Sequence, residues 1–252
     1  MGNLRRLLVV ELRELKRQAI MSLFFSIVGP VLIYFLYSNI MKYSGLRTGY
    51  SQINTIFVVV STTVVLFPML IGIYYWMRYL NKYGIIFSEL TNEYRLFELY
   101  LIKCFVHITH SFVNVAIFSF LLLILFKIYL TFNDFVLIAL LIFLICTTQY
   151  IVGLFFSLIF QKRAGSLIPV IIAYLVIFVL PGLLGTDAEI RGGMGFLGVC
   201  PVLYIPFLNL HNLFRSLFLF NEINFCLLWY TVAIDIILIF IGYFWFKKKL
   251  LR

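Results

Sequence analysis

The chain has 252 residues, of which 63% are hydrophobic and 12% are charged, and its mean hydropathy is +1.07. A composition this apolar excludes a soluble globule of this length and is typical of a membrane protein. The net charge of +10 would indicate nucleic-acid binding in a soluble protein. Here membrane topology and attraction to anionic lipid explain it better, so we expect a lipid bilayer and no nucleic acid as partner.

Six apolar runs follow one another along the chain. At about 1.5 Å of helix per residue, about 20 residues cross a hydrocarbon core of about 30 Å. Each run can therefore span a membrane if it is helical, the fifth only barely. We predict an all-α polytopic membrane protein with six transmembrane helices, in a single domain over residues 1–252. The expected spans are Ala19–Asn39, Ile53–Met77, Leu99–Phe126, Phe135–Phe160, Leu167–Leu184 and Phe225–Phe246.

Lysine and arginine are distributed unequally between the two sides of the predicted membrane. With the N-terminus inside, the inner segments hold 15 of the 20 cationic residues, and the outer segments hold five. The positive-inside rule then predicts a multi-pass protein of the plasma (inner) membrane with both termini in the cytoplasm. The five outer residues are Lys42, Arg47, Lys127, Arg191 and Arg215.

Residues 1–18 form a candidate amphipathic helix lying in the membrane interface. Five leucines between Leu4 and Leu15 recur at helical spacing on one face, with most basic residues away from it, although Glu11 interrupts the stripe. The alternative is a simple positive anchor that sets the topology. The segment is too long and too mixed in charge for a usual signal peptide, so we expect the first apolar run to remain as a span.

The segment 78–98 is the most polar stretch between spans. Gly84 breaks the helix that leaves the second span, and Ile85–Leu90 can form a short amphipathic helix; Thr91 or Asn92 can cap the helix after it. A short helix at the membrane face is what a membrane subunit needs to receive force from a soluble partner. An ordinary solvated loop is the alternative.

The segment 185–224 is glycine-rich in its first half and apolar in its second. Pro201 and Pro206 suit a lipid-facing helix poorly. A seventh span here would also move the basic residues Lys247–Lys249 to the outside. We therefore predict re-entrant or interfacial helices on the outer face, between the fifth and sixth spans, shielded by protein.

The sequence carries no motif of a known catalytic, cofactor or metal site. It has no phosphate loop, no HExxH and no GxSxG, and its three histidines have no acidic residue spaced for metal binding. Its four cysteines lack CxxC spacing, so we interpret them as small apolar packing residues. We therefore expect the chain itself not to be an enzyme.

Two ionisable residues lie in the middle of predicted spans. Asp235 and His110 each lie about 16 Å from the cytoplasmic end of their span, so a contact between them within one subunit is a candidate. The functional interpretation is a proton- or cation-sensitive site, and the structural one is a hydrogen bond between helices. We favour the structural one, because a single acid forms no relay.

Four residues around the start of the third span are Gly84, Glu98, Leu99 and Lys103. Their mutual spacing matches a motif of a known family, in which a glycine precedes a Glu-Leu pair that leads to a lysine at the start of the third span. In this pattern the chain resembles the membrane-spanning permeases of type-2 ATP-binding-cassette (ABC-2) exporters. The resemblance extends to the order of the elements: an amphipathic helix, six spans, both ends inside, and re-entrant helices between spans five and six. It therefore covers essentially the whole chain.

The resemblance implies a permease that pairs with a second copy of itself, as a homodimer, and with two ATP-binding-cassette ATPase subunits. ATP and magnesium would be bound by the ATPase, and this chain would bind no cofactor. Its cargo would be amphiphilic or apolar (lipid-linked, peptide or drug-like), moved out of the cytoplasm. The residues expected to dock on the ATPase are Gly84, Ile85, Ile86, Phe87, Glu89 and Leu90.

A transporter of another class is the main alternative. An ion-coupled secondary transporter or channel would need no ATPase, but it predicts several intramembrane acids and an internal repeat. The chain has one such acid, Asp235, and no evident repeat. A membrane anchor for a larger assembly is a third class.

Overall fold

The structure, a computed structural model, describes residues 2–44, 49–81, 93–128, 131–160, 167–174, 213–214, 216–217 and 223–250. The described part is helical, as the sequence predicts. Its helices are α1 (Gly2–Ser44), α2 (Gly49–Asn81), α4 (Glu93–Leu125), α5 (Phe132–Phe160), α6 (Leu167–Tyr174) and α10 (Phe225–Leu250).

Four of the described helices are long and apolar enough to cross a membrane. Their spanning stretches are Val59–Tyr79, Leu96–Leu125, Phe132–Phe160 and Leu228–Lys249, which correspond to the second, third, fourth and sixth expected spans. The apolar stretch of α1, Ser22–Leu36, is shorter. Of the fifth expected span, α6 covers only the first eight residues, and the rest lies outside the described residues. A total of six spans therefore stays a prediction.

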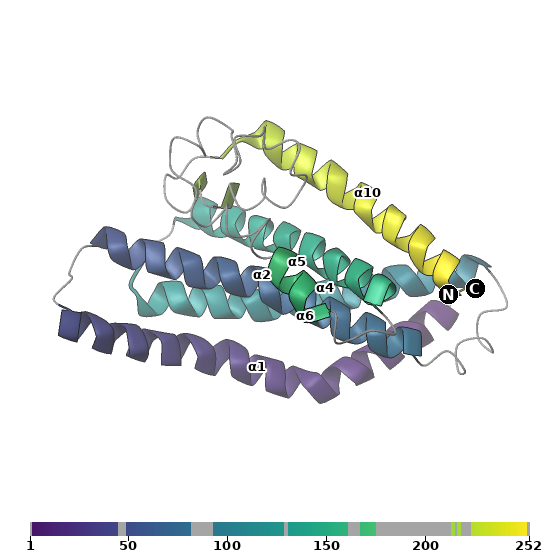
Figure 1. Ribbon diagram of the computed structural model, residues 1–252, viewed down its shortest axis with the longest axis horizontal. Coiled ribbons are helices and arrows are strands. Elements are labelled where there is room, and N and C mark those ends of the chain that lie inside the picture. Colours follow the sequence, from purple (N-terminus) through teal and green to yellow (C-terminus); the bar gives the residue numbers. More distant parts are fainter. Residues whose placement is uncertain are drawn as a thin grey trace.

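The long helices form an up-and-down bundle (Figure 1). The starts of α1 and α4 lie at the same end of the bundle as the ends of α2, α5 and α10. We call this end the basic end, because the lysine-rich last turn of α10 lies there. The helices α1, α2, α4 and α5 thus alternate in direction, as consecutive membrane spans must, whereas α10 runs in the same direction as α5.

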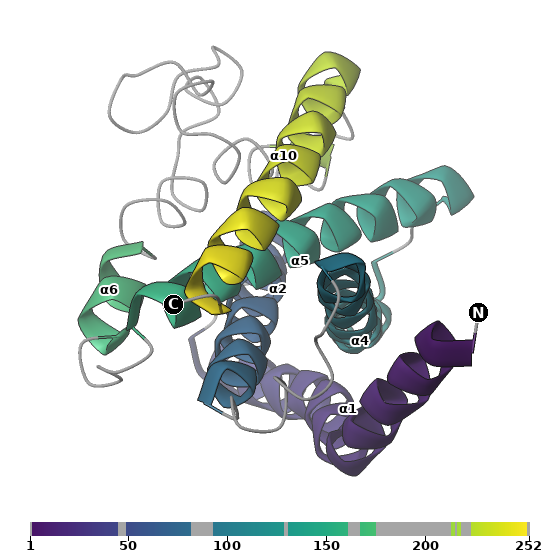
Figure 2. The same cartoon turned by 90° about the vertical axis from the view of Figure 1, so that its right-hand side faces the viewer.

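The predicted N-terminal helix and the first apolar run form one continuous helix. The helix expected over residues 1–18 does not end before the first apolar run, because α1 continues unbroken to Ser44. Its first part does point away from the axis of the rest (Figure 2), and Leu15 packs against Ile102 and Val106 of α4. Its placement in a membrane interface stays a prediction.

Most of the segment 185–224 lies outside the described residues. Three that are described, Leu213, Phe214 and Leu217, are buried in the core shared by α2, α4 and α5. The Phe214 ring stacks on Phe57 of α2, with centroids 5.7 Å apart. These three residues are covered by protein, and the re-entrant or interfacial helices expected over residues 185–224 stay a prediction.

Two local motifs flank the connection between α4 and α5: one ends α4 and the other begins α5. Lys127 adopts a φ of 55° and its N–H bonds the carbonyl of Ile124, while the Ile128 N–H bonds that of Leu123. This pattern is a Schellman cap, which ends α4. At the start of α5, the Thr131 N–H donates to Asp134 Oδ2 and the Asp134 N–H donates to Thr131 Oγ1. This capping box begins α5.

Two glycines set how closely α2 and α5 approach. A Cβ atom added to Gly72 would lie 2.6 Å from the Tyr150 carbonyl oxygen, and one added to Gly153 would lie 2.5 Å from that of Met69. No larger residue fits without moving a backbone. Small residues at crossing points are how membrane helices gain packing contacts, because lipid is as apolar as leucine and burial alone drives little association.

Candidate functional site

Cationic side chains gather at the basic end of the bundle. The described ones there are Arg13 and Lys16 of α1, Arg78 at the end of α2, Lys103 of α4, and Lys247, Lys248 and Lys249 of α10. At the opposite end, Lys127 is the one cationic side chain that the structure describes. The helix ends at the basic end are therefore the part of the described bundle most suited to an anionic leaflet or an acidic partner surface.

A cluster of aromatic side chains joins three helices at the basic end. Trp76 of α2, 1% exposed, contacts the rings of Tyr100 on α4 and Phe246 on α10, with centroids 5.6 Å and 5.0 Å away. Tyr79, one turn beyond Trp76, also packs on Phe246 at 5.8 Å. Tyr100 donates a hydrogen bond of 2.9 Å to the Ile239 carbonyl of α10. We call Trp76, Tyr79, Tyr100 and Phe246 the aromatic clamp.

Lys103 adds a charge to the aromatic clamp. Its side chain is 8% exposed, and its ammonium nitrogen lies 4.2 Å from the centroid of the Tyr79 ring. A cation over an aromatic face is stabilised by the ring's quadrupole, by about 0.5–2 kcal/mol depending on desolvation. Lys103 therefore ties the start of α4 to the end of α2, the two helices on either side of residues 82–92.

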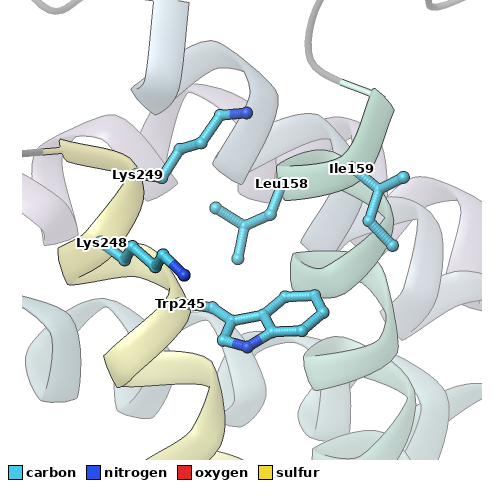
Figure 3. A pocket seen from close by; sticks show the side chains of 5 residues that line it. All are labelled: Leu158, Ile159, Trp245, Lys248 and Lys249. Atoms are coloured by element: carbon cyan, nitrogen blue, oxygen red, sulfur yellow. The ribbon is translucent and has the colours of Figure 1, made fainter. Parts of the chain in front are cut away.

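A small hollow lies beside the aromatic clamp, between the last turns of α5 and α10. It has a volume of about 240 Å³ and is lined by Leu158, Ile159, Trp245, Lys248 and Lys249. Figure 3 shows the Trp245 indole facing the α5 side chains, with the Lys248 side chain extending toward it. An indole beside lysine ammonium groups is the side-chain combination found at membrane–water interfaces.

The predicted entry residues of the third span take different positions at the start of α4. Glu98 is exposed, whereas Leu99 and Lys103 are each 8% exposed. The predicted coupling residues Gly84, Ile85, Ile86, Phe87, Glu89 and Leu90 lie outside the described residues. The structure therefore places the two helix ends that flank the coupling segment and describes nothing of the segment itself.

His110 faces α1. Its Nε2 lies 3.0 Å from Ser22 Oγ, and one turn on, Ser26 Oγ donates a 3.0 Å hydrogen bond to Asn114 Oδ1. The Asn114 amide in turn donates to the His110 carbonyl at 2.8 Å. These four residues form a polar ladder between α1 and α4. The two members of each pair are 88 positions apart in the sequence. The separation is the same for both pairs because the two helices run in the same direction.

Asp235 faces α5. The side chain is 3% exposed, and its Oδ1 lies 2.6 Å from Thr148 Oγ1. The candidate contact with His110, suggested by matching depth, does not form, because each residue is paired with a different helix. At the level of Asp235, α10 packs against α5, whereas its contacts with α4 come later, around Ile239 and Gly242.

The sequence analysis did not find the aromatic clamp, the polar ladder or Thr148. The ladder had a signal, since Ser22 and Ser26, like His110 and Asn114, are four residues apart within apolar runs. Such spacing puts both members of each pair on one helix face. Thr148 also had one, because it lies in the only Thr-Thr-Gln run of an otherwise apolar span.

The described residues include no group of three or more His, Cys, Asp or Glu side chains that could hold a metal ion. No protein-family model matches the chain, and no curated protein or solved structure matches it either. The resemblance to ABC-2 permeases thus remains a prediction from the sequence, and so does the function that it implies.

Proposed function

We propose that this chain is the permease subunit of an ATP-driven ABC-2 type exporter. It works as a homodimer with two ATPase subunits, which bind ATP and magnesium. It moves an amphiphilic or apolar cargo, such as a lipid-linked molecule, a peptide or a drug-like compound, out of the cytoplasm. The chain lies in the plasma (inner) membrane with both termini on the cytoplasmic side.

The observation that carries the proposal is the aromatic clamp and its position. Residues 82–92, where the coupling helix is proposed, connect the end of α2 to the start of α4. Trp76 and Tyr79 lie within the last six residues of α2, and Tyr100 and Lys103 lie early in α4. A push on the connecting segment therefore reaches two helices that are held together, and through Phe246 it also reaches α10.

The mechanism follows from this linkage. ATP binding draws the two ATPase subunits together, and each carries its docked coupling helix with it. Because the interior of a packed bundle deforms little, α2, α4 and α10 move together and rock one permease against the other. The exposed apolar faces of α1 and α10, which include Phe24, Leu32, Phe240 and Phe244, supply surface for lipid or for the second copy.

A substitution at Phe87 tests the coupling assignment. If the apolar side of the segment fills a groove on the ATPase, burial of Phe87 contributes roughly 1.5–3 kcal/mol. Phe87→Ala should then weaken the interface about tenfold or more, and Phe87→Asp should weaken it further, because it places an unpaired charge in the groove. The measurements are co-purification with the ATPase encoded by an adjacent reading frame and cargo-stimulated ATP hydrolysis.

The matched control is Phe132→Asp, at the end of the bundle opposite the basic end. Phe132 is 80% exposed at the start of α5, where an acidic residue is tolerated by the helix dipole. The control should leave co-purification and ATP hydrolysis at wild-type values. Wild-type values for Phe87→Asp as well would contradict the coupling role. An adjacent reading frame with a phosphate loop would support the exporter, and its absence would weaken it.

A second candidate, an ion-coupled transporter or channel without an ATPase, is favoured by one observation. Asp235 is buried in the middle of a membrane-spanning helix, where acidic residues often mark ion pathways. Transport by the purified chain in vesicles that contain no ATPase, driven by an ion gradient and lost in Asp235→Asn, would select this candidate.

A further inference from the structure

The hydroxyl group of Thr148 lies between two hydrogen-bonding oxygens. Its Oγ1 is 3.0 Å from the carbonyl oxygen of Leu144, one turn earlier in α5, and 2.6 Å from Asp235 Oδ1 in α10. A threonine hydroxyl has one proton to donate, and a backbone carbonyl can only accept. If Thr148 donates to Leu144, the hydrogen bond to Asp235 needs its proton from the carboxyl group.

From this arrangement we propose that Asp235 is a proton-binding site, occupied in the folded bundle. The carboxylic acid donates its proton to Thr148 Oγ1, and Thr148 donates in turn to the Leu144 carbonyl. The two bonds form a chain that runs from α10 into the backbone of α5. This inference does not depend on the proposed exporter function.

The second carboxyl oxygen supports the protonated form. Among the described residues, Asp235 Oδ2 is buried and has no hydrogen-bond partner. An ionised carboxylate carries its charge on both oxygens, and burial of a charge without partners costs far more than burial of a neutral polar atom. In the protonated acid Oδ2 is an uncharged carbonyl oxygen, whose missing partner costs far less than a missing partner of a charged oxygen.

The helix that packs against Asp235 offers no positive charge to an ionised carboxylate. Over Phe132–Phe160, α5 contains no lysine, arginine or histidine. Its ionisable side chains are Asp134, Cys146 and Tyr150. Asp134 lies about 21 Å along the helix from Thr148, at about 1.5 Å per residue, and bonds to Thr131 instead.

The cationic and imidazole side chains that the structure describes on α4 and on α10 itself are engaged or distant. On α4, His110 lies against Ser22, His107 stacks on Tyr75, and the Lys103 ammonium lies over Tyr79. On α10, the lysines begin at Lys247, about 18 Å along the helix from Asp235 at about 1.5 Å per residue. The described surroundings therefore favour the neutral acid.

The bound proton has a structural consequence for α10. Within the described residues, 22% of the most apolar part of α10 is buried, against 67% for α5, so each polar contact of α10 with the bundle matters for its position. Loss of the proton would remove the donor of the bond between the helices and leave a charge in the apolar interior. Binding of the proton thus stabilises the contact between α5 and α10.

Infrared spectroscopy of the protein in lipid vesicles at neutral pH tests the proposal. Exposed carboxyl groups are ionised at this pH, so a protonated Asp235 should give a separate carbonyl-stretch band of a carboxylic acid. We expect the band in wild type and its loss in Asp235→Asn. The matched control is Glu98→Gln, which removes an exposed carboxyl and should keep the band. A wild-type spectrum without the band, or an Asp235→Asn spectrum that retains it, would overturn the proposal.

Two further measurements keep the test independent of whether Asp235→Asn folds. The chain has three aspartates, Asp134, Asp187 and Asp235. Carboxyl-¹³C aspartate in the wild-type protein should therefore shift the band to lower frequency; a band that does not shift belongs to glutamate and contradicts the assignment. Thr148→Val, which removes the acceptor, should shift the band to higher frequency, whereas Thr148→Ser should not. An unshifted band in Thr148→Val would exclude donation to Thr148.

Discussion

The side chains at the basic end show how single residues in a membrane bundle combine burial with polarity. Lys103 is almost fully buried, yet its ammonium lies over the Tyr79 ring. Its stem adds apolar surface to the core while its charge is stabilised by an aromatic face. Tyr100 likewise buries its ring and places its hydroxyl against the carbonyl of Ile239.

At the residue scale we predict that Trp76 is the largest single contribution to the aromatic clamp. Its ring is 1% exposed and contacts aromatic side chains from α2, α4, α5 and α10. Trp76→Ala should lower the free energy of unfolding by about 3–5 kcal/mol, the usual cost of a large cavity. It should also reduce cargo-stimulated ATP hydrolysis, because α2 and α4 are no longer held together.

The matched control is Trp229→Ala on α10, where the indole is 69% exposed. A surface substitution of this kind should change the free energy of unfolding by no more than about 0.5 kcal/mol. Thermal unfolding of both variants in the same detergent measures the difference. Equal loss of stability in the two would show that the aromatic clamp is not a packed unit.

The helices of this bundle use two different means of association. Between α2 and α5, Gly72 and Gly153 bring the backbones close together. Between α1 and α4, the polar ladder supplies hydrogen bonds that connect Ser22 with His110 and Ser26 with Asn114. Both devices suit a medium in which apolar burial alone drives little helix association.

At the element scale we predict that Gly153 is essential for the α2–α5 contact. Gly153→Leu places a side chain where even a Cβ atom would lie 2.5 Å from the Met69 carbonyl oxygen and 2.9 Å from the Ile73 nitrogen. The two helices must separate, so the variant should unfold at a clearly lower temperature or fail to accumulate. Ala233→Leu, at an exposed position of α10, makes a similar enlargement and should be tolerated. Wild-type stability in Gly153→Leu would mean that this crossing is not as the structure has it.

The whole molecule is asymmetric along its long axis. One end carries exposed cationic side chains from α1 and α10. The other end contains the end of α4, where Lys127 is the one cationic side chain that the structure describes. Inner-leaflet lipid is anionic, and each lysine or arginine near such a surface contributes about 1 kcal/mol of attraction. The basic end therefore suits the cytoplasmic side.

This asymmetry predicts which positions react with a membrane-impermeant thiol reagent. In a background with serine at Cys200 and Cys226, Lys16→Cys and Lys249→Cys should be labelled only in inside-out vesicles. Lys127→Cys should be labelled only in right-side-out vesicles. Labelling of Lys16→Cys and Lys249→Cys from opposite sides would require an odd number of spans between them and would exclude the six-span arrangement.

Sequence alone predicted the helical class and four of the spanning helices, because both depend on local properties. A run of about 20 apolar residues must form a helix to satisfy its backbone groups in lipid, and this holds whatever its neighbours are. The direction of each helix follows as well, since spans alternate along the chain. The predictions for Gly84–Leu90 and for most of residues 185–224 lie outside the described residues and stay predictions.

The partners of the polar side chains were decided only by the tertiary structure. Counting residues gives the depth of a group along its helix, and on depth Asp235 and His110 were a plausible pair. It gives neither which helices touch nor which face each one turns to its neighbour. The structure turns Asp235 to Thr148 and His110 to Ser22, and it assembles the aromatic clamp from residues up to 170 positions apart, Trp76 and Phe246. Such contacts depend on how rigid helices of fixed shape fill space together, which no single segment encodes.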